Sequence, residues 1–134
     1  MREYMSESEL AYFAGIVDGE GCIGINLKKG TRNGYRITFQ VTNNSKGLID
    51  WVCERFGGKV RLVHHATYAV EWFSQGEVYD ILTAIRRFLI VKQKEADIML
   101  DYICTDSHDS YTRSMQQEVI SSFKKKNGKV MIHA

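Results

Sequence analysis

The sequence contains no proline, so glycine and polar residues must supply its turns. Its three cysteines, Cys22, Cys53 and Cys104, are widely spaced and form no CxxC pair, which argues against a zinc site or a disulfide framework. No apolar run is long enough to cross a bilayer, and residues 1–10 lack the apolar segment of a secretory signal. These absences exclude membrane-spanning and disulfide-rich secreted classes. We expect an intracellular protein of a bacterial or archaeal cytoplasm or of an organelle.

Excess charge is also small. The sequence has 18 Lys and Arg against 16 Asp and Glu, a formal net charge of +2. This balance alone does not identify a nucleic-acid-binding protein, so the question is whether the cations gather on one face. The length of 134 residues and the hydrophobic fraction of 44% predict one globular domain, residues 1–134, with a core of its own.

Residue periodicity predicts elements in the order α-β-β-α-β-β-α-α-α. Ser6 and Glu9 have the spacing of a capping box, and the first helix should end near residues 19–21. Two alternating runs, 22–28 and 36–42, predict a hairpin. Ser45 should cap a short helix that two glycines at 57–58 end.

The second half of the chain predicts another hairpin and three helices. In the first strand of this hairpin Val60 and Leu62 face one way, and Lys59, Arg61 and Val63 face the other. Alternation in the returning strand directs Tyr68, Val70 and Trp72 inward, and it directs outward Thr67, Ala69, Glu71 and Phe73. Apolar stripes predict helices over 78–85 and 92–104, and Met115, Val119 and Phe123 suggest a short last helix. The order is typical of an α+β fold with one mostly antiparallel sheet.

The most informative segment is residues 13–21, FAGIVDGEG. Ala11, Gly15 and Gly19 recur every four residues, so they form a strip of small side chains along which two helices could approach closely. Asp18 and Glu20 stand at the helix C-terminus, where each carboxylate opposes the helix dipole at a cost of about 0.3–1 kcal/mol. A bound divalent cation would reverse the sign of that cost. The plainer interpretation is a glycine-rich turn with two solvated acids.

This segment resembles the signature motif of the LAGLIDADG homing endonucleases. Residues 38–42, TFQVT, and 88–94, FLIVKQK, resemble later segments of that family in the expected order. The resemblance covers about residues 7–104. It implies an αββαββα core whose curved antiparallel sheet lies in the DNA major groove, followed here by a C-terminal helical extension over 105–134. Both an intron-encoded and a free-standing gene fit the sequence.

A single copy of the motif resembles the homodimeric type, in which the motif helices pack at the two-fold axis. Such a dimer would bind a long pseudo-palindromic double-stranded target, each subunit reading one half. The residues expected at the dimer interface are Ala11, Ala14, Gly15, Asp18 and Gly19.

The resemblance also implies the catalytic groups. The last acid of the motif, which binds the catalytic metal in the family, is Glu20 here, and the backbone carbonyl of Gly19 is the second expected ligand. Oxygen ligands suit Mg²⁺, with Mn²⁺ substituting and Ca²⁺ supporting binding without cleavage; no small-molecule cofactor is expected. Lys92 matches the family's active-site lysine, and Asn43 falls where relatives often have a glutamine that orders water. The implied reaction cleaves both strands across the minor groove and leaves short 3′ overhangs.

Strand alternation predicts a polar sheet face with a single acid, Glu71, while the other acids concentrate in the helices. Arginine suits guanine, glutamine suits adenine, and a glutamate accepts from cytosine. The expected DNA-binding residues are Asn26, Lys28, Lys29, Arg32, Asn33, Arg36, Thr38, Gln40, Thr42, Lys59, Arg61, His65 and Glu71. The plainer interpretation is that one face of an antiparallel sheet is simply solvated.

Two other functions stay open at this point. One is a non-cleaving DNA- or RNA-binding protein of the same fold, a regulator or an intron maturase. The other is an unrelated α+β oligomer whose glycine strip only builds a dimer. Glu20 and Lys92 favour the enzyme, because a pure binding protein has no reason to keep a carboxylate beside a phosphate. The unrelated oligomer leaves the polarised basic sheet unexplained.

Overall fold

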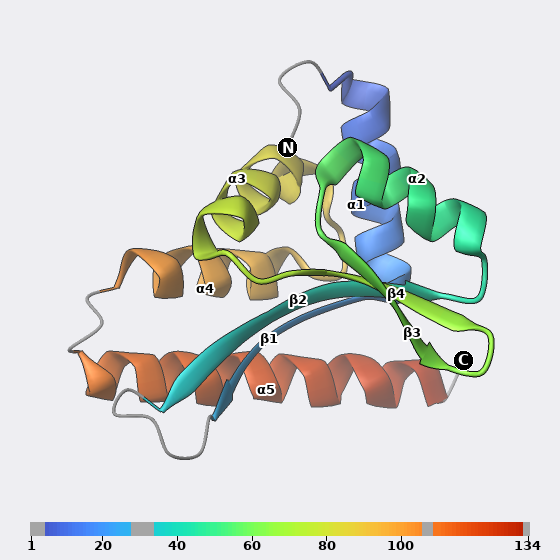
Figure 1. Ribbon diagram of the computed structural model, residues 1–134. Helices are drawn as coiled ribbons and strands as arrows, with labels where there is room; N and C mark the ends of the chain where they lie inside the picture. The colour runs from blue at the N-terminus through green and yellow to red at the C-terminus, as the bar shows by residue number, and fades with distance from the viewer. Residues whose placement is uncertain (1–4, 28–33, 106–108, 133–134) are drawn as a thin grey trace.

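The computed structural model describes residues 5–27, 34–105 and 109–132 of the chain. In the view of Figure 1, most of the helices lie above an arched sheet and the long C-terminal helix runs below it. The elements are α1 (Glu7–Glu20), β1 (Gly21–Leu27), β2 (Tyr35–Asn43), α2 (Lys46–Phe56), β3 (Lys59–His64), β4 (Thr67–Trp72), α3 (Gln75–Ile85), a 3₁₀ turn η1 (Arg86–Phe88), α4 (Gln93–Cys104) and α5 (Ser110–Ile132). The predicted αββαββα core with a curved antiparallel sheet is confirmed, and further C-terminal helices follow it.

Helix ends lie where the local sequence places them. The Ser6 hydroxyl caps α1 by accepting a hydrogen bond from the Glu9 amide at 3.1 Å, and Ser45 does the same for Leu48 at the start of α2. Helix α1 runs to Glu20. A Cβ at Gly21 would lie 2.6 Å from the carbonyl oxygen of Val17, so the sharp passage from α1 into β1 requires glycine.

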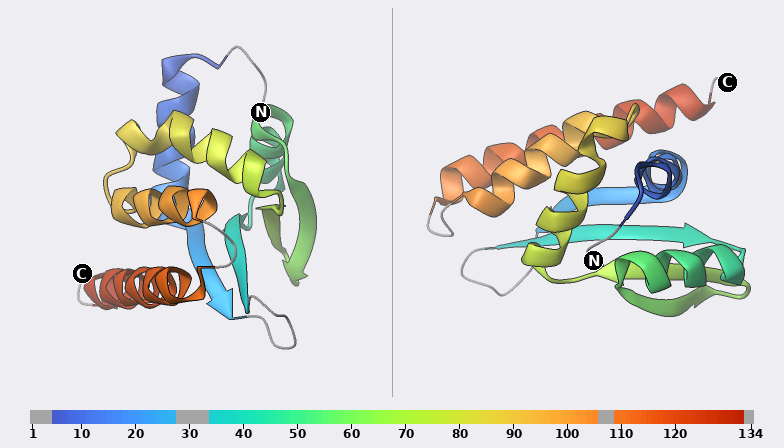
Figure 2. Two further views of the ribbon diagram at one scale, coloured as in Figure 1. Left: turned by 90° about the vertical axis from the view of Figure 1, so that its left-hand side faces the viewer. Right: turned by 90° about the horizontal axis from the view of Figure 1, so that it is seen from above.

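The four strands form one antiparallel sheet in the order β1-β2-β4-β3. Alternate residues point to opposite faces, and one face of the sheet lies beneath α1, α2 and α3 (Figures 1 and 2). The buried side chains on that face are Ile23, Ile25, Ile37, Phe39, Val41, Val70 and Trp72. The opposite face therefore carries the intervening polar residues, as the alternation predicts.

An aromatic cluster joins the helices to the sheet. The Phe13 ring of α1 stacks on Phe56 of α2 at 4.0 Å between centroids, and Phe39 stacks on Trp72 at 4.7 Å. The indole Nε1 of Trp72 donates to the Phe56 carbonyl at 3.0 Å, so this buried polar group is paired. This packing fixes where α1 meets the sheet, and hence where its C-terminal acids lie.

Strand β3 is more exposed than its alternation alone suggests. Val60 and Leu62 occupy the same face as Val70 and Tyr68, as expected from the alternation. They are nevertheless 37% and 57% exposed, so facing the same way as Val70 and Tyr68 does not bury them. The reason is that β3 is an edge strand. Ala69, predicted to point outward, is fully buried because its methyl group lies between its longer cross-strand partners Thr42 and Arg61.

The last helix is not short: α5 has 23 residues and runs beside β1, the other edge of the sheet (Figures 1 and 2). Two of the three residues that suggested this helix, Met115 and Val119, are 50% and 43% exposed and do not form its buried face. Ile120 is buried instead, and the Arg113 guanidinium lies 4.4 Å above the Tyr102 ring. Periodicity missed this face because an arginine contributes to it.

Two findings concern the absences noted in the sequence. Cys22, Cys53 and Cys104 form no disulfide bond with one another. Within the part of the chain that the structure describes, no helix is both long and apolar enough to span a membrane.

Candidate nucleic-acid interface

Glu20 is the last residue of α1, and it is exposed. Its carboxylate has no hydrogen-bond or ion-pair partner among the described residues. The C-terminal carbonyl groups of a helix lack partners within the helix. The end of α1 therefore presents carboxylate and carbonyl oxygens together, and Gly19 and Glu20 are the residues that could hold a divalent metal ion.

Asp18 is the centre of a hydrogen-bonded clamp within the chain. Its Oδ2 accepts from the Ile90 amide at 2.8 Å, and its Oδ1 accepts from the amides of Val91 and Lys92 at 3.1 and 2.9 Å. The sequence placed Asp18 at a dimer interface. Within one chain its carboxylate ties α1 to the segment that leads into α4, and its place at a dimer interface stays a prediction.

Lys92 reaches the same end of α1 from a distant part of the chain. It is the N-terminal flanking residue of α4, and its Nζ donates to the backbone carbonyl of Asp18 at 2.7 Å. This ammonium group lies at the helix end that carries Glu20. Two of the predicted catalytic residues, 72 positions apart in sequence, are therefore brought to one place.

Asn43 is the last residue of β2. Val41 of β2 pairs with Gly21, the first residue of β1. Asn43 is two residues further along β2, so it lies just beyond the junction of α1 with β1. Its Oδ1 accepts from the Ser45 amide at 2.8 Å, which shapes the turn into α2. The carbonyl oxygen of this side chain therefore stabilises the turn, and its NH₂ group is the part that could bind a ligand.

The sheet register brings the predicted DNA-binding residues onto one face. Asn26 pairs with Arg36, and Gln40 and Lys59 both pair with Glu71. Asn26 also donates a side-chain hydrogen bond to Thr38. The remaining members of this face, Thr42 and Arg61, flank Ala69.

The charges on this sheet face are unequal. Arg36, Lys59 and Arg61 are exposed cations, and Glu71 is the only acid among the predicted residues. Arg61 forms an ion pair with Glu71, whose side chain is only 14% exposed. This sheet face therefore keeps a net positive charge, and it is called the cationic face below. The Glu71 carboxylate holds the Arg61 guanidinium against the sheet.

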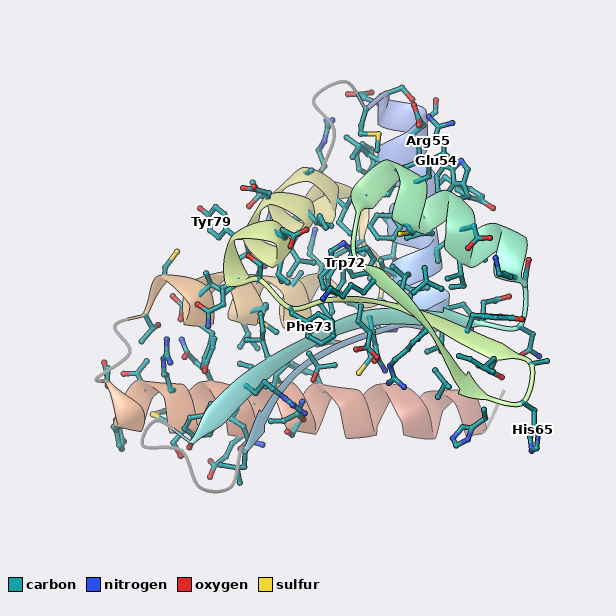
Figure 3. The ribbon with its side chains drawn as sticks, in the orientation of Figure 1. Glu54, Arg55, His65, Trp72, Phe73 and Tyr79 are labelled. Atoms are coloured by element: carbon teal, nitrogen blue, oxygen red, sulfur yellow. The ribbon has the colours of Figure 1, made fainter. Side chains whose placement is uncertain are left out.

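The hairpin loops are described only in part. Lys28, Lys29, Arg32 and Asn33 lie outside the described residues. His65 is at the tip of the β3–β4 hairpin with φ 27°, and Figure 3 shows it at the far end of that hairpin. Its side chain is exposed.

The small-residue strip of α1 lies on the surface of the chain. Ala11, Gly15 and Gly19 are exposed, and a Cβ built at either glycine would meet nothing within 4 Å. Ala14 is fully buried in the core, so the prediction that it lines an interface is wrong. It lies on the opposite side of the helix, with Phe13 and Val17.

Two features of this region were missed from the sequence. The Asp18 clamp had a local signal, because an acid in the last helical turn needs a compensating partner, but the partner is 72 residues away. Phe73 was expected to point outward and was assigned no role. It is 64% exposed and lines a hollow of the cationic face.

Comparison with solved structures identifies the fold. The homing endonuclease I-CvuI in complex with its target is 16% identical with a TM-score of 0.76, over 87% of this chain and 82% of that chain. The archaeal intron-encoded homing endonuclease I-Vdi141I, complexed with DNA, is 18% identical with a TM-score of 0.63, over 73% and 68%. The LAGLIDADG meganuclease I-AabMI, bound to uncleaved DNA, is 16% identical with a TM-score of 0.62, over 71% and 36%.

These matches confirm the predicted likeness to LAGLIDADG homing endonucleases at the level of the fold. By sequence, no protein-family model matches the chain, and the search of curated proteins finds no significant match.

Proposed function

We propose that this chain is a site-specific double-strand DNA endonuclease of the homing type that acts as a homodimer. The observation that carries this proposal is that the Lys92 ammonium is bound at the C-terminal end of α1, the helix end that carries Glu20, beside a cationic sheet face. A carboxylate for a metal and an ammonium for a phosphate are the charges that phosphodiester hydrolysis requires. The shared fold supports the same assignment, because DNA is bound in the neighbours compared above.

The metal site fits Mg²⁺ by its donor chemistry. The Glu20 carboxylate and the Gly19 carbonyl are hard oxygen donors, which Mg²⁺ prefers. The described residues of one chain contain no group of three acidic, histidine or cysteine side chains that would form a closed metal site. Mg²⁺ usually keeps several waters and binds through one or two carboxylates plus phosphates. One exposed carboxylate facing DNA therefore suits this ion, with Mn²⁺ substituting and Ca²⁺ supporting binding alone.

The chain's own residues divide the remaining work. A Mg²⁺ ion held by Glu20 would supply an activated water and charge stabilisation. The Lys92 ammonium, fixed by the Asp18 carbonyl, stabilises negative charge on the phosphate. Asn43 offers its NH₂ group to a water near the scissile bond, since its Oδ1 is engaged by Ser45. We infer cleavage across the minor groove that leaves short 3′ overhangs.

We propose that the sheet of each chain reads the target and that two copies of the chain bind it together. Arg36 and Gln40 would read base edges in the major groove, to which their side chains offer hydrogen-bond donors. The exposed strip of Ala11, Gly15 and Gly19 allows two α1 helices to approach closely. A two-fold dimer built on α1 would place two copies of Glu20 near the axis and read a pseudo-palindromic site.

A cleavage selection on a randomised duplex DNA library with Mg²⁺ tests the proposal. The wild type, Glu20→Gln and the matched control Glu54→Gln are run in parallel, and the cut ends are sequenced. Glu54 is an exposed acid on α2, labelled in Figure 3. We expect the wild type and Glu54→Gln to yield one pseudo-palindromic consensus with short 3′ overhangs, and Glu20→Gln to bind the same sequence without cutting it.

Two results would contradict the proposal. If the wild type enriches a DNA or RNA sequence but never cuts, the chain is a regulator or a maturase of this fold. If nothing is cut or bound, the sheet face is only a solvated surface.

A further inference from the structure

Phe73 is an apolar side chain in polar surroundings. It follows directly after β4 and is 64% exposed, whereas its neighbour Trp72 is 2% exposed. Figure 3 shows Trp72 toward the helices and Phe73 away from them. Because Phe39 pairs with Trp72, the register carries Phe73 alongside Thr38 on the cationic face.

The ring stands at the border of a hollow rather than on an open surface. The other side chains of the cationic face that line this hollow are Arg36, Thr38, Gln40, Arg61 and Glu71. Arg36 and Gln40 carry hydrogen-bond donors. The carboxylate in this lining, Glu71, is already engaged by Arg61. The hollow therefore combines an apolar wall with donor groups.

We propose that Phe73 forms a subsite for the C5-methyl group of a pyrimidine in the DNA major groove, and so determines specificity at one base pair of each half-site. This inference rests on the proposed DNA-binding function. Thymine is the expected base: its major-groove edge shows a methyl group beside the O4 acceptor, which matches an aromatic ring beside the donors of Arg36 and Gln40. 5-Methylcytosine has the same methyl group but an N4 donor in place of O4. The Arg36 guanidinium can only donate and the Glu71 carboxylate is engaged by Arg61, so the hollow favours the O4 acceptor of thymine.

The experiment removes the methyl group from the DNA and the ring from the protein. A duplex pool is first selected by wild-type binding with Ca²⁺, which gives a consensus. Duplexes of that consensus are then synthesised with each thymine, one base pair at a time, replaced in both half-sites by deoxyuracil, cytosine or 5-methylcytosine. Dissociation constants are measured for the wild type, Phe73→Ala, Phe73→Leu and the control Tyr79→Ala. Tyr79 is an exposed aromatic on α3, away from the sheet face in Figure 3.

At one symmetric position, deoxyuracil should weaken wild-type binding by about fourfold per half-site, the value of one buried methyl group. Phe73→Ala should bind the thymine and deoxyuracil duplexes equally and keep the wild-type preference at every other position. Phe73→Leu should restore part of the methyl preference, and Tyr79→Ala should behave as the wild type. If 5-methylcytosine instead binds better than thymine there, the methyl subsite stands and the thymine assignment is overturned.

The inference is overturned if the wild type binds thymine and deoxyuracil equally everywhere, or if Phe73→Ala keeps the methyl preference. Either result leaves the proposed endonuclease intact, because cleavage of the consensus is scored separately. A wild type that binds no duplex DNA refutes both.

Discussion

Removing the Asp18 carboxylate should destabilise the fold more than removing any solvated acid. Its two oxygens accept three backbone hydrogen bonds, from Ile90, Val91 and Lys92. Hydrogen bonds to a charged group contribute about 1.5–3 kcal/mol each when well shielded and about 0.5 kcal/mol at the low end of ordinary bonds. The Lys92 bond is partly buried and the other two are exposed. We therefore expect Asp18→Ala to lower the free energy of unfolding by about 2–3 kcal/mol.

The Asp18→Asn variant separates charge from geometry. In one orientation the asparagine oxygen accepts from the Val91 and Lys92 amides, and its NH₂ group faces the Ile90 amide. In the other orientation the oxygen accepts from the Ile90 amide, and the NH₂ group faces the other two amides. We expect a loss of about 1–2 kcal/mol, between the wild type and Asp18→Ala. The Lys92 Nζ bond goes to the Asp18 backbone carbonyl, so neither variant removes it directly.

Urea denaturation at fixed salt measures both variants against a matched control. Asp50→Ala removes an acid that forms an exposed ion pair with Lys46 at 2.7 Å, so the free energy of unfolding should stay close to that of the wild type. An Asp18→Ala free energy within about 0.5 kcal/mol of the wild type would refute the clamp as a stabilising contact.

Three further predictions concern catalysis, assembly and pH. Lys92→Met should lower kcat for cleavage by about 10²-fold while the dissociation constant for the target stays within about twofold; equal losses in both would make Lys92 a binding residue. Gly15→Leu should still give a folded chain, because a Cβ there meets nothing within 4 Å. Sedimentation should show the variant as a monomer where the wild type is a dimer, and a variant that stays dimeric would locate the interface elsewhere. Hydrogen bonds from Thr112 lower the pKa of Asp109 below its usual 3.8. The ionised Asp109 therefore stabilises the fold above that pH, and this contribution is lost as the pH falls through the lowered pKa. Thermal melts should show Asp109→Ala less stable than the wild type at neutral pH and equal to it in acid, and a difference that stays constant with pH would contradict the assignment.

Elements with local signals could be predicted from the sequence. Ser6 and Ser45 cap α1 and α2 as expected because a capping hydroxyl needs only the next three residues. The outward face of β2 followed from alternation, since helices cover its other side. The exposure of Val60 and Leu62 could not be predicted, because burial depends on what covers an edge strand and not on the strand's own pattern.

Long-range features of the site could not be predicted in the same way. The Asp18 clamp and the approach of Lys92 join segments more than 70 positions apart, so no local pattern records them. The buried face of α5 includes Arg113, which lies over the Tyr102 ring, and a search for apolar stripes passes over such a residue. The roles of Glu20 and Asn43 stay predictions.

The two edges of the sheet differ in a way that bears on aggregation. A bare edge strand is a template for further strands and thus for uncontrolled association. Helix α5 runs beside the β1 edge, while β3 has a register irregularity between Leu62 and His64 and presents Lys59 and Arg61 next to its exposed valine and leucine. Bulges and cations are the devices by which natural proteins discourage edge-to-edge pairing. Sheet extension is therefore a disfavoured route for contact between copies, and an amyloid-like failure of this fold would start at β3.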